Sequence, residues 1–184
     1  MSYTDLKYKF KSIGKNVHIG NNVYFRYPEL IEIGDNVIID DFCYFTTSIS
    51  LGNFVHIGPH CTCIGGRSSK LLMKDFSGLS AGCRVICGSD DYTTGLTNPN
   101  IPVQFRGDNK IGEIVIGKHA VLGTNTIVHP MINIGEGAAT GSLTLVTKDL
   151  DEWAIYLGAP AKKFKERDKF NILKLEQEFL KTLE

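Results

Sequence analysis

A strict six-residue period runs from Ile116 to Leu150 and constrains the fold more than any other feature of the chain. Divided into blocks, this stretch reads IGKHAV, LGTNTI, VHPMIN, IGEGAA, TGSLTL and VTKDL, with glycine second in four of the six. An α-helix cannot keep one face at a period of six, because its side chains realign at steps of about 3.6 residues. A short strand followed by a turn can keep one face at this period. Each hexad is therefore predicted to form one flat wall of a parallel β-helix, a solenoid whose coils bury a core by stacking.

Two positions of each hexad are predicted to face the interior. The first position carries mostly large aliphatic side chains: Ile116, Leu122, Val128, Ile134, Thr140 and Val146. The fifth position carries small or branched side chains: Ala120, Thr126, Ile132, Ala138, Thr144 and Leu150.

The same phase extends back to Ile13, with interruptions after Phe25, Cys63 and Val85. Three walls close one triangular coil, so the chain is predicted to form about six coils. Each interruption follows the third hexad of its coil, and all excursions should leave the solenoid at one corner. The longest, residues 91–114 after coil four, is rich in Asn, Gly, Pro and Thr and is longer than a connection needs to be, which favours a functional loop.

The two ends of the chain depart from the hexad pattern. Residues 1–12, with Tyr3, Leu6, Tyr8 and Phe10, are expected to cap the open end of the solenoid. The ladder is predicted to end at Leu150, and apolar residues at helical spacing in 165–184 predict a C-terminal α-helix. We expect a single domain over 1–184: the cap at 1–12, the β-helix at 13–150, and the tail and helix at 151–184.

Composition narrows the possible partners and the compartment. Lys and Arg number 20, and so do Asp and Glu, so charge favours neither nucleic acid nor an anionic membrane. The chain has no apolar run of the roughly 18 residues that a membrane helix needs, and its first residues lack a signal-peptide pattern. Its five cysteines show no CxxC spacing, and three fall in fifth positions, as buried hydrophobes in a reduced compartment would. We therefore expect a cytoplasmic protein.

The hexads, together with the segment WAIYLGAPAKK at 153–163, resemble the hexapeptide-repeat acyltransferases. Within them, the chain is most similar to the sugar O- and N-acetyltransferases related to galactoside and maltose acetyltransferases. The resemblance covers residues 13–167. It implies a left-handed parallel β-helix, a homotrimer, and transfer of an acetyl group from acetyl-CoA to a hydroxyl or amine of a sugar or nucleotide-sugar in cell-surface polysaccharide synthesis. It implies no metal.

The resemblance also implies a coenzyme A site. The turn with Gly158 and Pro160, followed by Lys162 and Lys163, resembles the segment that lies against the coenzyme, where two cations would meet phosphates. The family's contacts to the pantetheine arm would fall on Gly123, Gly141, Ser142, Thr147 and Lys148. The alternative is that the lysines are solvated and the glycines serve only as coil corners.

The chain departs from the family at the catalytic base. The family's histidine, before the long loop, is replaced by Asp90, with Asp91 beside it. Three readings stay open. In the first, Asp90 or Asp91 is the base. In the second, His56 or His60 of a neighbouring subunit pairs with Asp90 and acts as the base. In the third, the acceptor is an unprotonated amine that needs no base, and the two aspartates position the sugar. The structural alternative for the pair is a turn that opens the loop.

The long loop and the remaining histidines carry further polar side chains. Tyr92, Asn98 and Arg106 of the loop are candidates for the acceptor site. His119 and His129 are expected to have surface or corner roles, and His18 a structural one.

Two other functions share this fold. A zinc enzyme similar to carbonic anhydrase needs about three converging histidines, and His56 and His60 find no third. A non-catalytic scaffold would fit the missing family histidine but not the intact tail.

Overall fold

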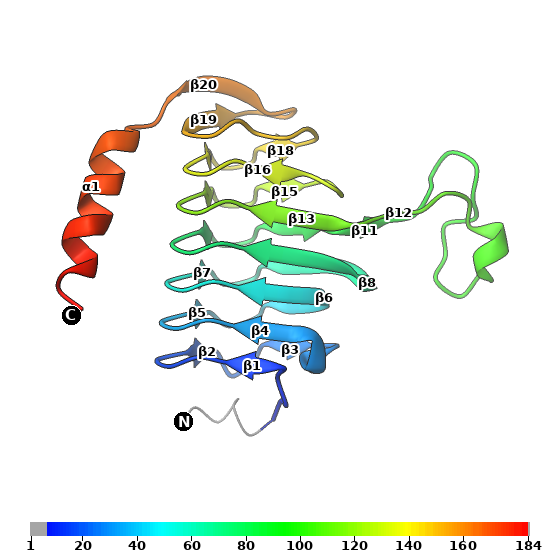
Figure 1. The fold of residues 1–184 in the computed structure, drawn as a ribbon. Coiled ribbons are helices and arrows are strands. Elements are labelled where there is room, and N and C mark those ends of the chain that lie inside the picture. Colours follow the sequence, from blue (N-terminus) through cyan, green and yellow to red (C-terminus); the bar gives the residue numbers. More distant parts are fainter. Residues whose placement is uncertain (1–6, 184) are drawn as a thin grey trace.

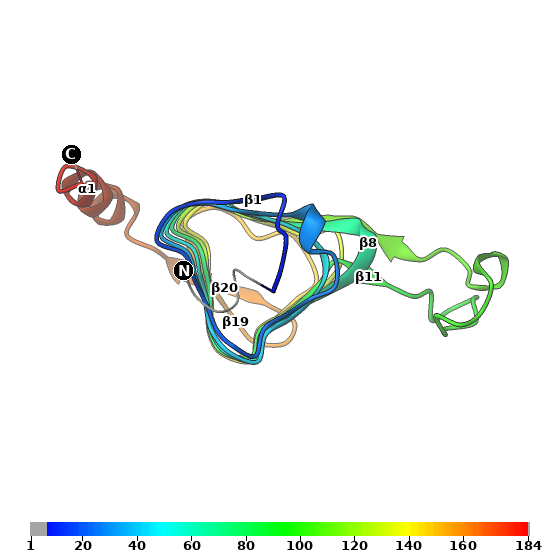
Figure 2. The same cartoon turned by 90° about the horizontal axis from the view of Figure 1, so that it is seen from below.

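The computed structural model describes residues 7–183, so the predicted cap residues Tyr3 and Leu6 lie outside the described residues. A solenoid of short parallel strands carries a helix along one edge and a protruding loop at another (Figure 1). Seen from its N-terminal end in Figure 2, the chain turns counterclockwise as it recedes, which makes the β-helix left-handed as expected.

Three walls of strands form each coil, and we name them A, B and C in chain order. Wall A contains β1 (Ser12–Ile13), β4 (Ile31–Ile33), the end of β6 (Tyr44–Leu51), the end of β8 (Thr62–Met73), β13 (Glu113–Ile116) and β16 (Asn133–Ile134). Wall B contains β2 (His18–Ile19), β5 (Ile38–Ile39), β7 (His56–Ile57), β9 (Gly78–Leu79), β14 (Val121–Leu122), β17 (Ala139–Thr140) and β19 (Ala154–Leu157). Wall C contains β3 (Tyr24–Phe25), the starts of β6 and β8, β10 (Arg84–Ile86), β15 (Ile127–Val128) and β18 (Leu145–Val146).

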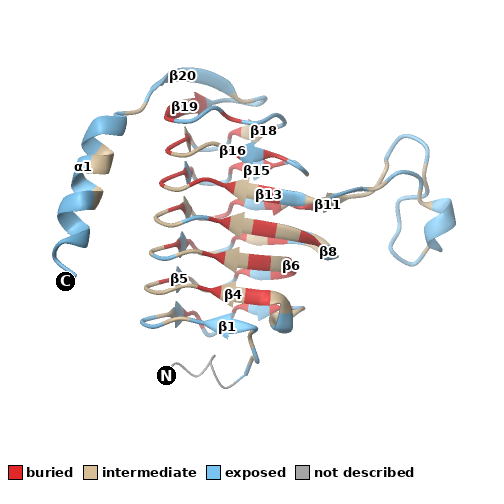
Figure 3. Ribbon diagram, in the orientation of Figure 1, coloured by how far each residue is buried: buried red, intermediate tan, exposed pale blue. Residues whose placement is uncertain are grey.

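The register of wall A confirms the predicted phase on both sides of every interruption. Ile33 pairs with Ile13 below it and Leu51 above it, and Met73 pairs with Ile116 across the long loop. The inward columns are buried (Figure 3). All five cysteines are buried and unpaired, as hydrophobic core residues would be.

The ladder continues beyond Leu150, where it was predicted to end. Leu150 bridges to Ile134 on wall A, and Tyr156 pairs with Thr140 on wall B, so a partial seventh turn closes the stack. Leu150 comes four positions after Val146, the preceding inward residue of wall C, whereas inward residues on either side of the other uninterrupted corners are six positions apart. This shorter corner breaks the six-residue phase in the sequence although the stacking continues.

The interruptions leave the solenoid at the corner between walls C and A, as predicted. The short helix η2 (Pro28–Leu30), the extension of β8 and the long loop all lie at this corner in Figure 2. The loop leaves and returns through an antiparallel pair, β11 (Gly88–Ser89) and β12 (Lys110–Ile111), and carries η3 (Val103–Phe105). We call residues 90–109 the arm.

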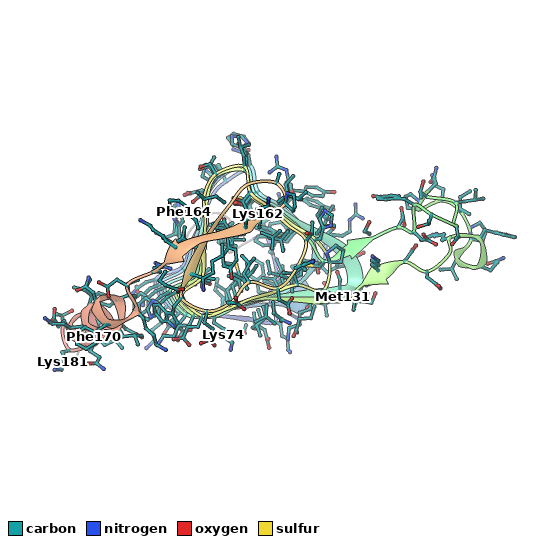
Figure 4. All side chains as sticks on the ribbon, turned by 90° about the horizontal axis from the view of Figure 1, so that it is seen from above. Lys74, Met131, Lys162, Phe164, Phe170 and Lys181 are labelled. Atoms are coloured by element: carbon teal, nitrogen blue, oxygen red, sulfur yellow. The ribbon has the colours of Figure 1, made fainter. Side chains whose placement is uncertain are left out.

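Each end of the solenoid is covered. Near the N-terminus, the rings of Tyr8 and Phe10 meet Phe25 edge-on, both with centroids 5.1 Å from it. At the other end, β20 (Lys162–Glu166) pairs antiparallel with β19, and Figure 4 shows Lys162 and Phe164 above the last coil.

The helix α1 (Lys169–Leu180) lies along the corner between walls A and B. Glu176 joins it to the solenoid, with carboxylate oxygens 2.5 Å from Lys118 Nζ and 2.9 Å from His119 Nε2. The ring of Phe179 meets Phe54 edge-on. The helix was predicted over 165–184, and its first predicted residues are instead in β20, because they pair with β19.

Candidate active site

A pocket lies at the base of the arm, against the outer surface where wall C ends. Ile64 and Ile86 form part of its apolar lining. Its polar lining comes from Ser89, Asp90, Tyr92, Arg106, Asn109 and His129. Asp90 is half-buried, and its carboxylate makes no hydrogen bond or ion pair within residues 7–183. A carboxylate in this setting is available to a ligand.

The neighbouring Asp91 is engaged in holding the arm together. Its carboxylate accepts hydrogen bonds from the hydroxyl of Thr94, from the backbone N–H of Thr93 at 2.8 Å, and from that of Asp108 at 3.3 Å. The bonds from Thr94 and Thr93, led by the Thr94 hydroxyl, hold the pKa of Asp91 well below its ordinary value. The acidic pair therefore divides into a structural residue, Asp91, and an available one, Asp90.

The predicted acceptor residues of the arm differ in their placement. Arg106 donates to the carbonyls of Ile101 and Pro99, both at 2.6 Å, and lines the pocket. Tyr92 also lines the pocket and is 81% exposed. Asn98 is outside the pocket lining and accepts a hydrogen bond from Asn100 within its own turn.

The outer surface of wall B holds a second hollow, which contains His56. Its Nε2 lies 2.9 Å from Asp40 Oδ2 of the coil below. The hollow is also lined by Phe54, Phe76, Gly78, Ser80 and Val121. His60 does not join them, because its ring stacks on Phe42 at the next corner, 5.0 Å between centroids.

The candidate coenzyme residues gather around the C-terminal end of wall C. Gly123, Gly141 and Ser142 lie at the corner between walls B and C, and Thr147 and Lys148 at the corner between C and A. A Cβ on Gly123 would meet the Gly141 backbone at 2.6 Å, so close stacking of the coils by itself accounts for that glycine.

The tail turn comes against the same wall. The carbonyl of Gly158 accepts from Leu145 N–H, and Pro160 follows on the exposed side. Lys163 pairs with Glu166 at 2.7 Å. Lys162 is exposed and forms no ion pair with any described residue.

Comparisons with known proteins agree with this architecture. No protein-family model matches the chain. A dTDP-4-amino-4,6-dideoxy-D-glucose acyltransferase of Escherichia coli is 35% identical over 175 residues, covering 92% of this chain and 88% of the relative. A serine-to-cysteine variant of AntD, an N-acyltransferase from Bacillus cereus solved with dTDP-4-amino-4,6-dideoxyglucose and coenzyme A, matches at a TM-score of 0.93 and 38% identity, over 99% of this chain and 97% of that one. A galactoside acetyltransferase in complex with coenzyme A shares the fold, with a TM-score of 0.57 and 19% identity over 89% of this chain and 68% of that one.

The chain belongs to the hexapeptide-repeat sugar acyltransferases. This confirms the family and the enzyme class that the hexads and the tail predicted. Within residues 7–183, the acyltransferase has no group of three or more His, Cys, Asp or Glu side chains that could hold a metal ion. In the same range, none of its helices is both long and apolar enough to span a bilayer.

Two residues lie at the candidate site of the acyltransferase without having been expected there from the sequence. His129 is exposed at the corner after wall C, in line with its expected surface or corner position, and it also lines the arm pocket together with Asp90. Asp40 stands in no recognised motif, yet its carboxylate contacts His56. Stacking the hexads would have identified the second pair, because Ile39 lies beneath Ile57, which places Asp40 and His56 on adjacent coils of one outer surface.

Proposed function

We propose that this acyltransferase moves an acyl group from acyl-CoA to the amino group of a nucleotide-linked 4-amino-sugar. The observation that carries the proposal is the unengaged carboxylate of Asp90 in the arm pocket. A carboxylate can bind and orient an amine through a charge-assisted hydrogen bond. The similarity to an enzyme solved with dTDP-4-amino-4,6-dideoxyglucose and coenzyme A, which extends over 99% of the chain, supports the same class of acceptor.

The variants of AntD that have been solved support the choice of Asp90. They replace either one serine or one aspartate of that protein. The separation of those two positions equals the separation of Ser80 and Asp90 here. We therefore add Ser80, in the wall B hollow, to the candidate site.

Arg106 is suited to the nucleotide diphosphate. A guanidinium has five N–H donors, and the two carbonyls of the arm occupy only some of them. Tyr92 offers an exposed ring in the same pocket for stacking. Asn98 has the weaker case of the three, since it does not line the pocket.

The coenzyme is proposed to lie along the outer surface of wall C. Lys148 and Lys162 would meet its phosphates, and Gly123, Gly141, Ser142 and Thr147 would border the pantetheine arm. Leu143, 71% exposed, and Met131, 60% exposed, offer apolar surface beside these residues. Lys163 and Pro160 would shape the turn more than bind the coenzyme. For Lys163 the reason is that its ammonium already pairs with Glu166.

Complete sites require more than one copy of the chain. Asp90 lies beside wall C and the arm, whereas Ser80 and His56 lie in the wall B hollow. A three-fold symmetric trimer would place wall B of one copy against wall C and the arm of the next, giving three equivalent sites. Five buried thiols suit a reduced compartment, and we place the enzyme in the cytoplasm, in synthesis of cell-surface polysaccharide.

A coenzyme-release assay tests the proposed acceptor. Acetyl-CoA and 3-hydroxybutyryl-CoA would each be supplied with dTDP-4-amino-4,6-dideoxyglucose or with its 4-hydroxy counterpart. We expect release with the amine, with Asp90→Asn lowering kcat/KM on the order of 100-fold. Glu178→Gln, on the exposed side of α1, is the matched control and should be unchanged. Release with the hydroxyl sugar alone would overturn the amine acceptor, and binding of coenzyme without any release would favour the scaffold alternative.

A further inference from the structure

The outer column of wall B changes abruptly in size above His56. From the first coil upward, the stacked outward residues are His18, Ile38, His56, Gly78, Val121 and Ala139. Gly78 stands directly over His56 and leaves the space beside the imidazole open, which forms the hollow.

Packing does not explain the glycine. A Cβ at Gly78 would meet nothing nearer than the carbonyl oxygen of His56 at 3.5 Å, an ordinary contact. Glycine within a strand is unfavourable because of its backbone freedom, and here no close approach of the chain requires it. The open space is thus a property of the outer surface and not of the core.

The imidazole in this space is held by a carboxylate. Asp40 Oδ2 lies 2.9 Å from His56 Nε2, and the two side chains are 36% and 56% exposed. An ionised carboxylate only accepts hydrogen bonds, so a neutral imidazole in this contact donates from Nε2 and leaves the lone pair of Nδ1 for a substrate. No described residue bonds Nδ1. Exposed ion pairs contribute little to the free energy of folding, so the contact between Asp40 and His56 is poorly explained by a role in stability.

We propose that His56 is the general base of acyl transfer and that Asp40 is its positioning residue. The inference deepens the proposed function and rests on it. Carboxylates are weak bases at neutral pH, whereas imidazole is suited to proton transfer there. Asp90 of the adjoining copy would then orient the amine that His56 deprotonates.

The step balances without a further reactant. The amine nitrogen attacks the thioester carbonyl carbon, and a C–N bond forms as a proton passes from nitrogen to His56 Nδ1. The C–S bond then breaks, and the coenzyme thiolate leaves and takes the proton from His56. The products are an amide and the free thiol, with the histidine returned to its neutral form.

The test is a double-mutant cycle on the intact enzyme, with the amino-sugar nucleotide as acceptor. His56→Ala should lower kcat by about 100-fold or more, and Asp40→Asn by about tenfold, with each KM nearly unchanged. The double variant should be no slower than His56→Ala, because Asp40 acts through the imidazole. Added imidazole should restore part of the rate of His56→Ala, which a structural role would not allow.

His18→Ala is the matched control, since this histidine occupies the same outward column two coils lower. It should keep the wild-type rate, and thermal unfolding should show that all variants are folded. If His56→Ala keeps kcat within about twofold of wild type, or the two losses multiply in the double variant, the inference is overturned. A wild-type enzyme that is inactive with the amine would overturn the proposed function and this inference together.

Discussion

Mixing two inactive variants distinguishes a site between subunits from a site within one. One preparation carries Asp90→Asn and the other His56→Ala, and the subunits are exchanged by unfolding and refolding together. Asp90 lies in the arm pocket and His56 in the wall B hollow, on different faces of the same solenoid. In a trimer with sites between copies, each site therefore takes these two residues from different chains.

The expected recovery follows from random assortment. Half of the chains in an equal mixture supply an intact Asp90 and half an intact His56, so about one quarter of the sites contain both. If each variant alone keeps about 1% of wild-type kcat, the mixture should show roughly 25-fold more activity than either. The assay is coenzyme release, after mass measurement has confirmed mixed trimers.

A second mixture provides the control. Asp40→Asn and His56→Ala affect the same wall of the same chain. No chain in this mixture has both residues intact, so its activity should not exceed the average of the two variants measured alone. Mixed trimers of the first pair that stay at background activity would refute the placement of the site between copies.

Three further outcomes are expected. Lys162→Ala should raise KM for acyl-CoA about fivefold with kcat unchanged, because it removes a charge-assisted bond to phosphate. Lys163→Ala should raise KM less, because the Lys163 ammonium already pairs with Glu166. Equal effects of the two variants in steady-state kinetics would contradict this. Glu176→Gln should destabilise the attachment of α1 by about 1–2 kcal/mol, read as faster tryptic release of the helix with the solenoid intact, and unchanged cleavage would contradict this. Hydrogen bonds depress the pKa of Asp91 in the folded arm, so the stabilisation of the arm by this carboxylate should be complete above about pH 4 and be lost as the pH falls further. The loss would be measured as weaker protection of the arm's backbone amides from exchange. Asp91→Asn should lack this pH dependence.

The hexads determined most of the fold, because each inward column must be buried. Interruptions of different length separate Ile13 from Ile33, Leu51 from Met73, and Met73 from Ile116, yet each pair stacks as its hexad positions predict. The partial turn from Leu150 to Tyr156 was missed because its corner is shorter, and stacking tolerates corner lengths that a fixed period does not. The six-residue period therefore identifies the walls of the solenoid more reliably than it identifies the last coil.

The candidate site was less predictable, because outward side chains are not constrained by the core. Asp90 and Asp91 are equivalent in sequence, and only the folded arm shows that Thr93 and Thr94 engage one of them. Such a distinction depends on turn geometry that composition does not specify. The contact between Asp40 and His56, in contrast, follows from register once the coils are aligned.

Under the proposed function, the architecture would allow acyl transfer without a histidine at the loop corner. The inward columns form the buried core of the solenoid, so a change at an exposed outward position costs the fold little. Outward residues on consecutive coils lie about 4.8 Å apart, close enough for Asp40 to hold His56. In a site closed by two copies, wall B of one faces the arm of the other. Under the proposed assignment, the base has moved across that interface, and Asp90 keeps the task of orienting the amine.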